Sequence, residues 1–320
     1  MAGLPDIPGP KLYPFNTSGR PLEIDFLEQI GKGAHSFVWK VKINEKIYAL
    51  KIFLAYFLPP NTYGADLSEE DEYVHSQPFH NECRAYGRLK EFGREDLAVA
   101  CHGYIILDEK HTGILKKAYT DTEWYSDWGV GRTLKHGLYK PLQALVKDLI
   151  HIPTDLRWVD EFKLIMNPRI ARKAIKDLKT IHRLGVCVGD ISTNNFIYGK
   201  HIEFSYAWTA PHPLLTRQFG DDFGGLRRHF KDTEAMDELI DDWNRMHPNR
   251  KIWVRCEPSE EYRDKLRKRR RAEDWWDWDV NPADFDYEKA QKRFGRLKAV
   301  EAPQSELSEE KNEDSKASTI

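Results

Sequence analysis

The apolar residues of this chain change their spacing partway along its length, and this change limits the folds open to it. In the first half, β-rich runs at 37–41 and 47–52 flank Asn44 and Glu45, which predicts two strands joined by a hairpin. Another strand is expected just before them, from 24 to 33, and the later pattern becomes helical. Strands first and helices later predict an α+β protein with two unequal lobes, a small mainly β lobe and a larger mainly α lobe.

Three helices can be placed from their end signals. The clearest has Asn167 as cap and Pro168 in its first turn, carries an apolar stripe, and stops at Gly185. An earlier helix leads up to a stop at Gly93, and a later amphipathic helix ends before Pro248. These two helices are expected at 81–92 and 233–247, and two further apolar runs lie at 103–107 and 144–150.

The length and the composition of the two ends set the expected domain boundaries. At roughly 100–200 residues per domain, 320 residues indicate about two domains or lobes. The first residues are interrupted by prolines and the last are nearly free of large apolar side chains, so both ends are expected to be disordered. The predicted divisions are an extended lead-in at 1–22, an N-terminal lobe at 23–150 with insertions at 54–80 and 110–142, a helical C-terminal lobe at 151–300, and an acidic tail at 301–320.

Charge and cysteine content exclude several classes of protein. The formal net charge of −2 gives no global field that would draw the chain onto nucleic acid or a membrane. The four cysteines are scattered, so neither a disulfide framework nor a zinc site is implied. No signal-peptide h-region or membrane-length apolar run is present. We therefore expect a nuclear or cytoplasmic protein that is neither secreted nor membrane-embedded.

Small residues between two strands suggest a phosphate-binding loop at 31–38. Gly31 and Gly33 would let the backbone fold close over phosphates, although a plain glycine-containing hairpin turn explains the same spacing. Lys51 strengthens the first reading, because a lysine in an apolar strand needs an anionic partner, which Glu82 can supply. The alternative is an edge lysine that reaches solvent beside a solvated glutamate.

The segment 185–198, directly after the long helix, carries the strongest chemical pattern. Asp190 and Asn195 stand five residues apart on a loop that leads into a strand, so that a carboxylate could accept a substrate proton while the amide oxygen coordinates magnesium. Glu203, beyond a turn at 199–200, would be the second metal-binding carboxylate. A literal Asp-Phe-Gly at 222–224 is a rival for that role, but it lies much farther along the chain from Asn195.

Taken in this order, these segments resemble the protein kinase fold over roughly residues 24–209. The resemblance implies ATP and Mg²⁺ as cofactors, an ion pair between Lys51 and Glu82 at the phosphates, and a hinge at 147–150 that meets adenine. The residue roles it implies are catalytic for Asp190 and Lys51, nucleotide-binding for Gly31, Gly33, Lys51, Glu82, Asp148 and Ile150, and metal-binding for Asn195 and Glu203.

A narrower resemblance is to the fungal Fta-two family, which is named for a subunit of the kinetochore Sim-four complex. Three stretches carry it: HNECRAYGRL at 80–89, CHGYI at 101–105 and FSYAWTAPHP at 204–213. This resemblance implies protein partners in a kinetochore complex and a nuclear location.

Several residues depart from the kinase pattern. Val188 replaces the usual histidine before the catalytic aspartate, which predicts a loop with less polar support. Glu203 replaces an aspartate, and its extra methylene shifts the carboxylate by about 1.5 Å, a scale of misplacement that costs about a hundredfold in rate. Ser36 replaces the third loop glycine, and no Ala-Pro-Glu sequence ends an activation segment, so the activation segment is reduced and a peptide platform is not indicated.

Three functions follow as alternatives. The first is a Mg-ATP-dependent phosphotransferase of weak activity, the second a pseudokinase that acts as an interaction scaffold, and the third a small-molecule kinase of the choline or aminoglycoside type. The basic run at 265–271 could be a nuclear localisation signal, while the acidic residues interleaved with the nearby tryptophans argue against a nucleic-acid patch. No acceptor and no oligomeric state is indicated by the sequence.

Overall fold

A computed structural model describes eight ranges of the chain: 4–17, 19–33, 35–54, 67–119, 141–151, 168–215, 225–256 and 282–295. The strands are β1 (Ile24–Lys32), β2 (Ser36–Ile43), β3 (Lys46–Phe53), β4 (Cys101–Ile106), β5 (Gln143–Lys147), β6 (Val186–Cys187), β7 (Phe196–Ile197), β8 (Lys200–His201) and β9 (Trp208–Thr209). The α-helices are α1 (Glu69–Ser76), α2 (Pro78–Glu91), α3 (Glu109–Tyr119), α5 (Pro168–Arg183), α6 (Gly225–Met246) and α8 (Tyr287–Phe294). Short 3₁₀ helices include η1 (Glu95–Leu97), η4 (Thr193–Asn195), η5 (Pro213–Leu215) and η6 (Pro282–Asp284).

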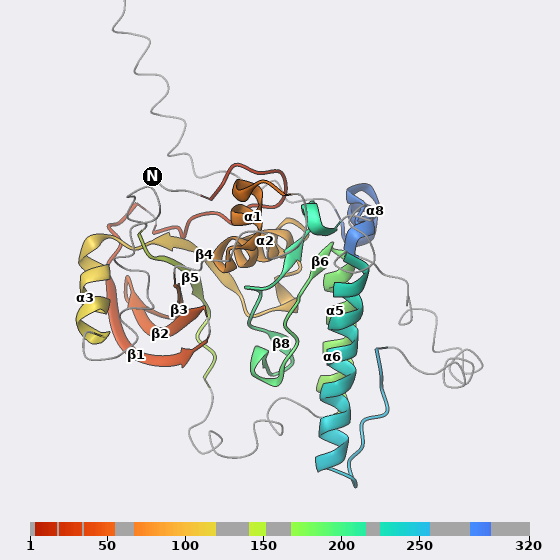
Figure 1. Cartoon of the computed structure of the whole chain (residues 1–320). Helices are drawn as coiled ribbons and strands as arrows, with labels where there is room; N and C mark the ends of the chain where they lie inside the picture. The colour runs from red at the N-terminus through yellow and green to blue at the C-terminus, as the bar shows by residue number, and fades with distance from the viewer. Residues whose placement is uncertain are drawn as a thin grey trace, which may run out of the picture.

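An antiparallel sheet with the order β1-β2-β3-β5-β4 forms the N-terminal part, as the β-rich runs predicted. The β2–β3 hairpin turns at Asn44 and Glu45, whose φ angles of 46° and 74° are the positive values that a tight two-residue turn requires. In Figure 1 the sheet and α3 lie on the left, α5 and α6 run side by side on the right, and α2 lies between them. The α+β class with strands first and helices later is confirmed.

The two faces of the sheet belong to different hydrophobic cores. On one face, Leu50 and Ile52 pack with Leu115 of α3. On the other, Phe53 and Leu145 join a larger core that includes residues of α2, α5 and α6. Because side chains alternate along a strand, this division fixes which residues of β3 and β5 face α2.

Two helices lie inside the predicted insertions. Ser68 caps α1 by accepting from the backbone N–H of Asp71 at 3.0 Å, and α1 falls within the 54–80 insertion. Helix α3 lies almost wholly within the insertion predicted at 110–142, where no helix was predicted from the sequence. The buried Leu115 provides the packing that secures this helix.

The predicted helix boundaries are correct at several ends and wrong at others. Helix α5 begins at Pro168 and ends before Gly185, whose φ of 72° confirms the glycine stop. Gly93, with a φ of 61°, likewise follows the end of α2. Helix α2 begins at Pro78 rather than residue 81, and α6 begins at Gly225 rather than residue 233. Proline in the first turn was the missed start signal for α2.

The N-terminal lead-in is extended, as expected, but the prediction of disorder is wrong for residues 4–17. Leu12 is 2% exposed, and the backbone of Tyr104 on β4 accepts from Phe15 at 2.8 Å and donates to Tyr13 at 3.2 Å. Gly103 permits this approach, because a Cβ there would lie 2.7 Å from the Phe15 nitrogen. Docking onto a strand edge far along the chain leaves no local pattern in the sequence.

Several predicted segments lie outside the described residues. They are the Asn167 cap, the Asp-Phe-Gly at 222–224, the basic run at 265–271, the tail at 301–320, and residues 55–66 and 120–140 of the two insertions. Within the part of the chain that is described, no helix combines the length and the apolar character needed to cross a membrane.

Candidate functional site

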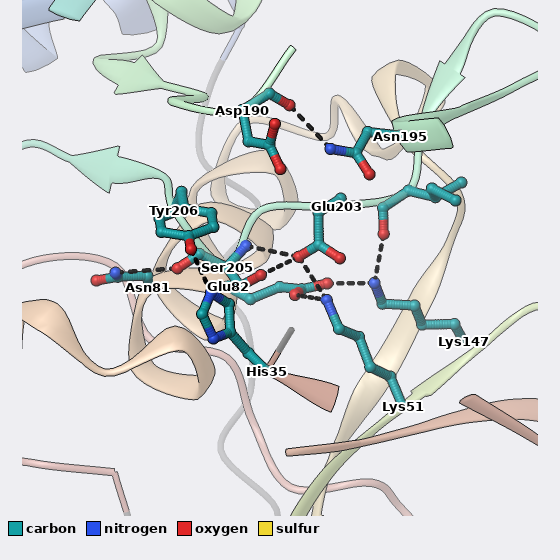
Figure 2. A network of polar contacts seen from close by, with 11 residues as sticks. His35, Lys51, Asn81, Glu82, Lys147, Asp190, Asn195, Glu203, Ser205 and Tyr206 are labelled. Atoms are coloured by element: carbon teal, nitrogen blue, oxygen red, sulfur yellow. Dashed lines mark hydrogen bonds and ion pairs between the residues drawn. The ribbon is translucent and has the colours of Figure 1, made fainter. Parts of the chain in front are cut away.

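Four charged side chains from four separate segments meet between the sheet and α2, and we call them the ionic cluster: Lys51, Glu82, Lys147 and Glu203. The Lys51 Nζ atom lies 2.6 Å from Glu82 Oε2 and 2.5 Å from Glu203 Oε1. Lys147 pairs with the other oxygen of Glu82 and donates to the carbonyl of Ile202 at 2.8 Å. Figure 2 shows these contacts as one connected network. The predicted ion pair between Lys51 and Glu82 is therefore formed, and Glu82 is buried rather than exposed to solvent.

Strand register places both lysines on the same face of the sheet. Lys51 on β3 lies opposite Leu145 on β5, and Lys147 lies opposite Ala49. Side chains two residues apart on a strand share a face, so Lys51 and Lys147 both point toward α2. Glu82 comes from the second turn of α2 and is 0% exposed. Burying so many charges is tolerated because each one has an oppositely charged partner.

The pKa values of the cluster reflect this mutual neutralisation. Burial by itself raises the pKa of the Glu203 carboxyl, but the ammonium groups of Lys51 and Lys147 outweigh it and hold that pKa well below its usual range. Burial lowers the pKa of Lys147, and the carboxylates of Glu82 and Glu203 more than compensate, so that its pKa is raised. Glu203 and Lys147 are therefore in their charged forms at neutral pH.

Glu203 is also held by its own neighbouring residue. The backbone N–H of Ser205 donates to Glu203 Oε1 at 2.9 Å, and the Ser205 hydroxyl donates to the same atom. The carboxylate thus accepts from Lys51 and twice from Ser205 on one oxygen, while Oε2 accepts no hydrogen bond from the described residues. This arrangement points the carboxylate at Lys51 and leaves one oxygen for a further ligand.

A tight hairpin carries Glu203 back toward Asn195. Strands β7 and β8 pair with a two-residue turn at Tyr198 and Gly199, one residue earlier than the predicted turn at 199–200. The backbone N–H of Ile202 donates to the carbonyl of Asn195 at 3.0 Å. The Asn195 amide nitrogen in turn donates to the carbonyl of Asp190 at 3.1 Å, which leaves its amide oxygen for other contacts. In Figure 2 the Asp190 carboxylate and the Asn195 amide lie on the Glu203 side of the cluster.

The loop before Asp190 is anchored by a residue that the sequence did not point to. Asp232 of α6 is 1% exposed and accepts from the backbone N–H of Val188 at 2.7 Å and of Gly189 at 2.8 Å. His182 contacts the same carboxylate at 3.0 Å. Val188 itself gives the loop no side-chain hydrogen bond, and Asp232 of α6 supplies polar support to the loop backbone, which was not predicted from the sequence.

The glycine-containing loop folds down onto the segment after Glu203. Gly31 lies in β1 opposite Val38, and the Gly33 N–H donates to Ser36 at 2.8 Å. The buried His35 ring contacts the Tyr206 hydroxyl at 2.5 Å. Burial lowers the pKa of His35, and the charges of Glu203, Lys51 and Asp190 also act on it. His35, which the sequence pattern did not single out, therefore connects the loop to Tyr206, three residues after Glu203.

The predicted hinge divides between buried and exposed positions. Lys147 points into the cluster, whereas Asp148 is exposed, accepts from His102 at 2.7 Å and donates its N–H to Ala100 at 3.0 Å. Ile150 is partly buried. Within the described ranges, no hydrogen bond or ion pair joins the side chain of Asp148 or Ile150 to the cluster. Lys147 could have been found by the argument used for Lys51, since both are lysines in apolar strands.

Helix α2 is fastened to the C-terminal elements by side chains beyond the cluster. Asn81 donates to the Ser205 carbonyl at 3.1 Å, and Arg84 donates to the carbonyl of Thr209 at 3.1 Å. Arg88 is 0% exposed, donates to the Leu184 carbonyl at 3.0 Å and also to that of Ala210. Its guanidinium lies 4.0 Å from the Phe285 ring centroid, so it also contacts the segment just before α8.

In the described part of the chain, no group of three or more His, Cys, Asp or Glu side chains is arranged to hold a metal ion. A site built from Asn195 and Glu203 would thus use one carboxylate and one amide oxygen from the chain.

Comparison with known proteins gives one family match. The family model described as Kinetochore Sim4 complex subunit FTA2 matches residues 1–208. This range includes every residue of the ionic cluster as well as Asp190 and Asn195. No curated protein matches the chain.

Proposed function

This chain belongs to the family of kinetochore Sim4 complex subunits described as FTA2, and from that premise we propose a kinetochore-associated protein that binds Mg-ATP through a kinase-like fold. The family indicates a kinetochore-associated role with protein partners and a nuclear location. Nucleotide binding is our addition to that role, and it is argued from the ionic cluster.

The observation that carries the proposal is the meeting of Lys51, Glu82 and Glu203 from three distant parts of the chain. Phosphoryl transfer depends on positioning and charge neutralisation, and a lysine fixed by a glutamate on a helix is a common way to hold phosphate oxygens. The order of the elements also supports a bilobal kinase-like fold: an antiparallel sheet, a helix packed against it, a long helix, and then a polar loop ending in a short hairpin.

Each residue has a role in this proposal. Lys51, held by Glu82, binds nucleotide phosphates, and the loop with Gly31 and Gly33 covers them. Asp190 accepts the proton of an acceptor hydroxyl. In addition, Asp148 and Ile150 follow β5, and their backbone lies beside the adenine.

Asn195 and Glu203 have the oxygen ligands that magnesium prefers. The Asn195 amide nitrogen is already used as a donor to Asp190, which orients the amide oxygen as a ligand atom. Glu203 Oε2, which accepts no hydrogen bond from the described residues, is likewise available as a ligand atom. The ion would neutralise the phosphate charge that Lys51 alone does not balance.

A second function, a pseudokinase acting as a scaffold for protein partners, is favoured by one observation. Lys51 is 3% exposed and is contacted by Glu203 as well as Glu82, so the ammonium is closed to solvent. A chain that uses its cluster to stabilise the fold and presents other surfaces to partners would have this arrangement.

Calorimetric titration with ATP, in the presence and absence of magnesium, tests the main proposal. We expect magnesium-assisted binding by the wild type, weakened about tenfold or more by Lys51→Met, as expected for loss of a charge-assisted contact. Asp25→Asn, an exposed carboxylate on β1, serves as the matched control and should bind as the wild type does.

Turnover then separates the two functions. Phosphotransfer or ATP hydrolysis that Asp190→Asn abolishes would exclude a purely scaffolding role. Binding of Mg-ATP with no turnover would leave the scaffold as the function, and absence of any binding would overturn the nucleotide site.

A further inference from the structure

We propose that Glu203 occupies the anion-binding position of Lys51 in the free protein, so that nucleotide binds only together with a divalent cation that takes Glu203. This inference rests on the proposed nucleotide site and concerns how that site is regulated. The Lys51–Glu203 contact is called the latch below.

Burial of Lys51 is the first observation. Its side chain is 3% exposed, and its Nζ atom has carboxylate oxygens at 2.6 Å and 2.5 Å. A phosphate can reach this ammonium only if one of the two carboxylates moves aside. Glu82 is the one that stays, because its second oxygen is held by Lys147 and its side chain is 0% exposed.

Glu203 is the carboxylate that can leave. Its side chain is 21% exposed, whereas that of Glu82 is wholly covered. All its hydrogen bonds use Oε1, and two of them come from Ser205, only two residues away. A rotation of this side chain therefore breaks one long-range contact, the one to Lys51.

Charge balance makes the latch depend on a cation. Lys51 and Lys147 carry two positive charges, and Glu82 and Glu203 carry two negative ones, so the closed cluster is neutral. A polyanion entering without a cation would meet the displaced Glu203 and the nearby Asp190, which also acts electrostatically on His35. Like charges brought together in a partly buried site strongly oppose binding.

Removing the negative charge of Glu203 should therefore release the site. In Glu203→Gln the cluster keeps Lys51, Lys147 and Glu82, with a net charge of +1, and the amide no longer forms an ion pair with the ammonium. The variant loses a magnesium ligand but gains an open anion site. Substitution of a residue that served only as a metal ligand would leave ATP binding unchanged in the absence of metal.

The test measures the dissociation constant for ATP in excess chelator and in excess magnesium, for the wild type, Glu203→Gln and Asp25→Asn. We expect the wild type and Asp25→Asn to bind ATP at least tenfold more weakly in chelator than in magnesium. Glu203→Gln should bind ATP in chelator at least tenfold more tightly than the wild type does, and magnesium should no longer improve its binding.

Several results would overturn the latch. They are equal wild-type binding with and without magnesium, or no gain for Glu203→Gln in chelator while the wild type binds Mg-ATP. If the wild type binds under neither condition but Glu203→Gln binds in chelator, Glu203 blocks Lys51 but magnesium does not release it, so the cation dependence and the proposed Mg-ATP function both fail. If neither protein binds, both fail.

A second, milder variant tests the latch even if Glu203→Gln fails to fold. Ser205→Ala removes one of the two local donors to Glu203 Oε1 and keeps both charges. With the side chain held less firmly, we expect magnesium to bring the ATP affinity of this variant to its maximum at a several-fold lower concentration than in the wild type. An unchanged magnesium dependence would contradict the role of Ser205 in the latch. Circular dichroism of each variant verifies that it is folded.

Discussion

Replacing Asp232 with alanine removes the shared acceptor that fixes the loop before Asp190. The backbone N–H groups of Val188 and Gly189 would lose acceptors at 2.7 Å and 2.8 Å, and His182 would lose its contact with this carboxylate at 3.0 Å. Leaving a buried donor unsatisfied costs about 1–3 kcal/mol. Val188 is buried whereas Gly189 is exposed and its N–H can be hydrated, so we expect a loss of about 1–3 kcal/mol in the free energy of unfolding. Asp232→Asn keeps one oxygen acceptor and should lose about half as much.

Urea denaturation of the two variants, followed by circular dichroism, measures this loss. Hydrogen exchange provides the local readout, since the amides of Val188 and Gly189 should exchange much faster in Asp232→Ala than in the wild type. The control is Asp25→Asn on β1, which should leave both measurements unchanged. A loss below about 1 kcal/mol in Asp232→Ala, or protected amides at both positions, would refute the assignment of Asp232 as the anchor.

The same carboxylate gives a pH dependence whose sign can be stated. Burial raises the pKa of Asp232, but His182 and the two backbone amides outweigh it, so the pKa is lowered in the folded protein. The folded state therefore binds fewer protons than the unfolded state as pH falls, and the Asp232 contribution is present above the unfolded pKa of about 3.9 and lost below it. The stability difference between wild type and Asp232→Ala should accordingly shrink below about pH 4.

Three further predictions concern other parts of the fold. Lys147→Met removes the buried donor to Glu82 Oε1 and to the Ile202 carbonyl, while Lys51 still donates to Glu82 Oε2, and should cost about 3–5 kcal/mol in urea denaturation. Lys90→Met at an exposed pair should cost less than about 1 kcal/mol, and similar losses in the two variants would contradict the burial argument. Gly87→Ala should speed proteolysis of the lead-in, because the new Cβ would lie 2.8 Å from Lys11, and an unchanged cleavage rate would show that the lead-in does not depend on this contact. Burial lowers the pKa of His75 and His80 to about 4, so the free energy of unfolding should fall as pH drops from about 6.5 to 4. His80→Gln should make this dependence on pH less steep, and an unaltered dependence would exclude His80 as a contributor.

Local patterns predicted the parts of the fold that depend on neighbouring residues. The hairpin at Asn44 and Glu45 and the glycine stops at Gly93 and Gly185 follow from turn and cap chemistry over a few positions. The pair of Lys51 and Glu82 was also predictable, because a lysine in an apolar strand needs a partner.

The missed features depend on contacts between remote segments. Asp232 looks like an ordinary acidic residue of an amphipathic helix, and only the packing of α6 against the loop brings it to Val188 and Gly189. The lead-in has few apolar residues, yet Leu12 is buried because the chain docks along β4. Neither the contact of Asp232 with the loop nor the docking of the lead-in on β4 leaves a periodic signal in the sequence.

The buried guanidinium of Arg88 has a consequence for where this protein can be divided. The stretch shared with the family ends at residue 208, but Arg88 donates to Ala210 and is covered by the ring of Phe285, which also lies against Gly185. In a polypeptide truncated after residue 208, the Arg88 guanidinium would lose the ring that covers it. Gly185, just after the end of α5, would lose its contact with the same Phe285 ring. We therefore expect a fragment that ends at residue 208 to be less stable than one that extends at least to Phe285.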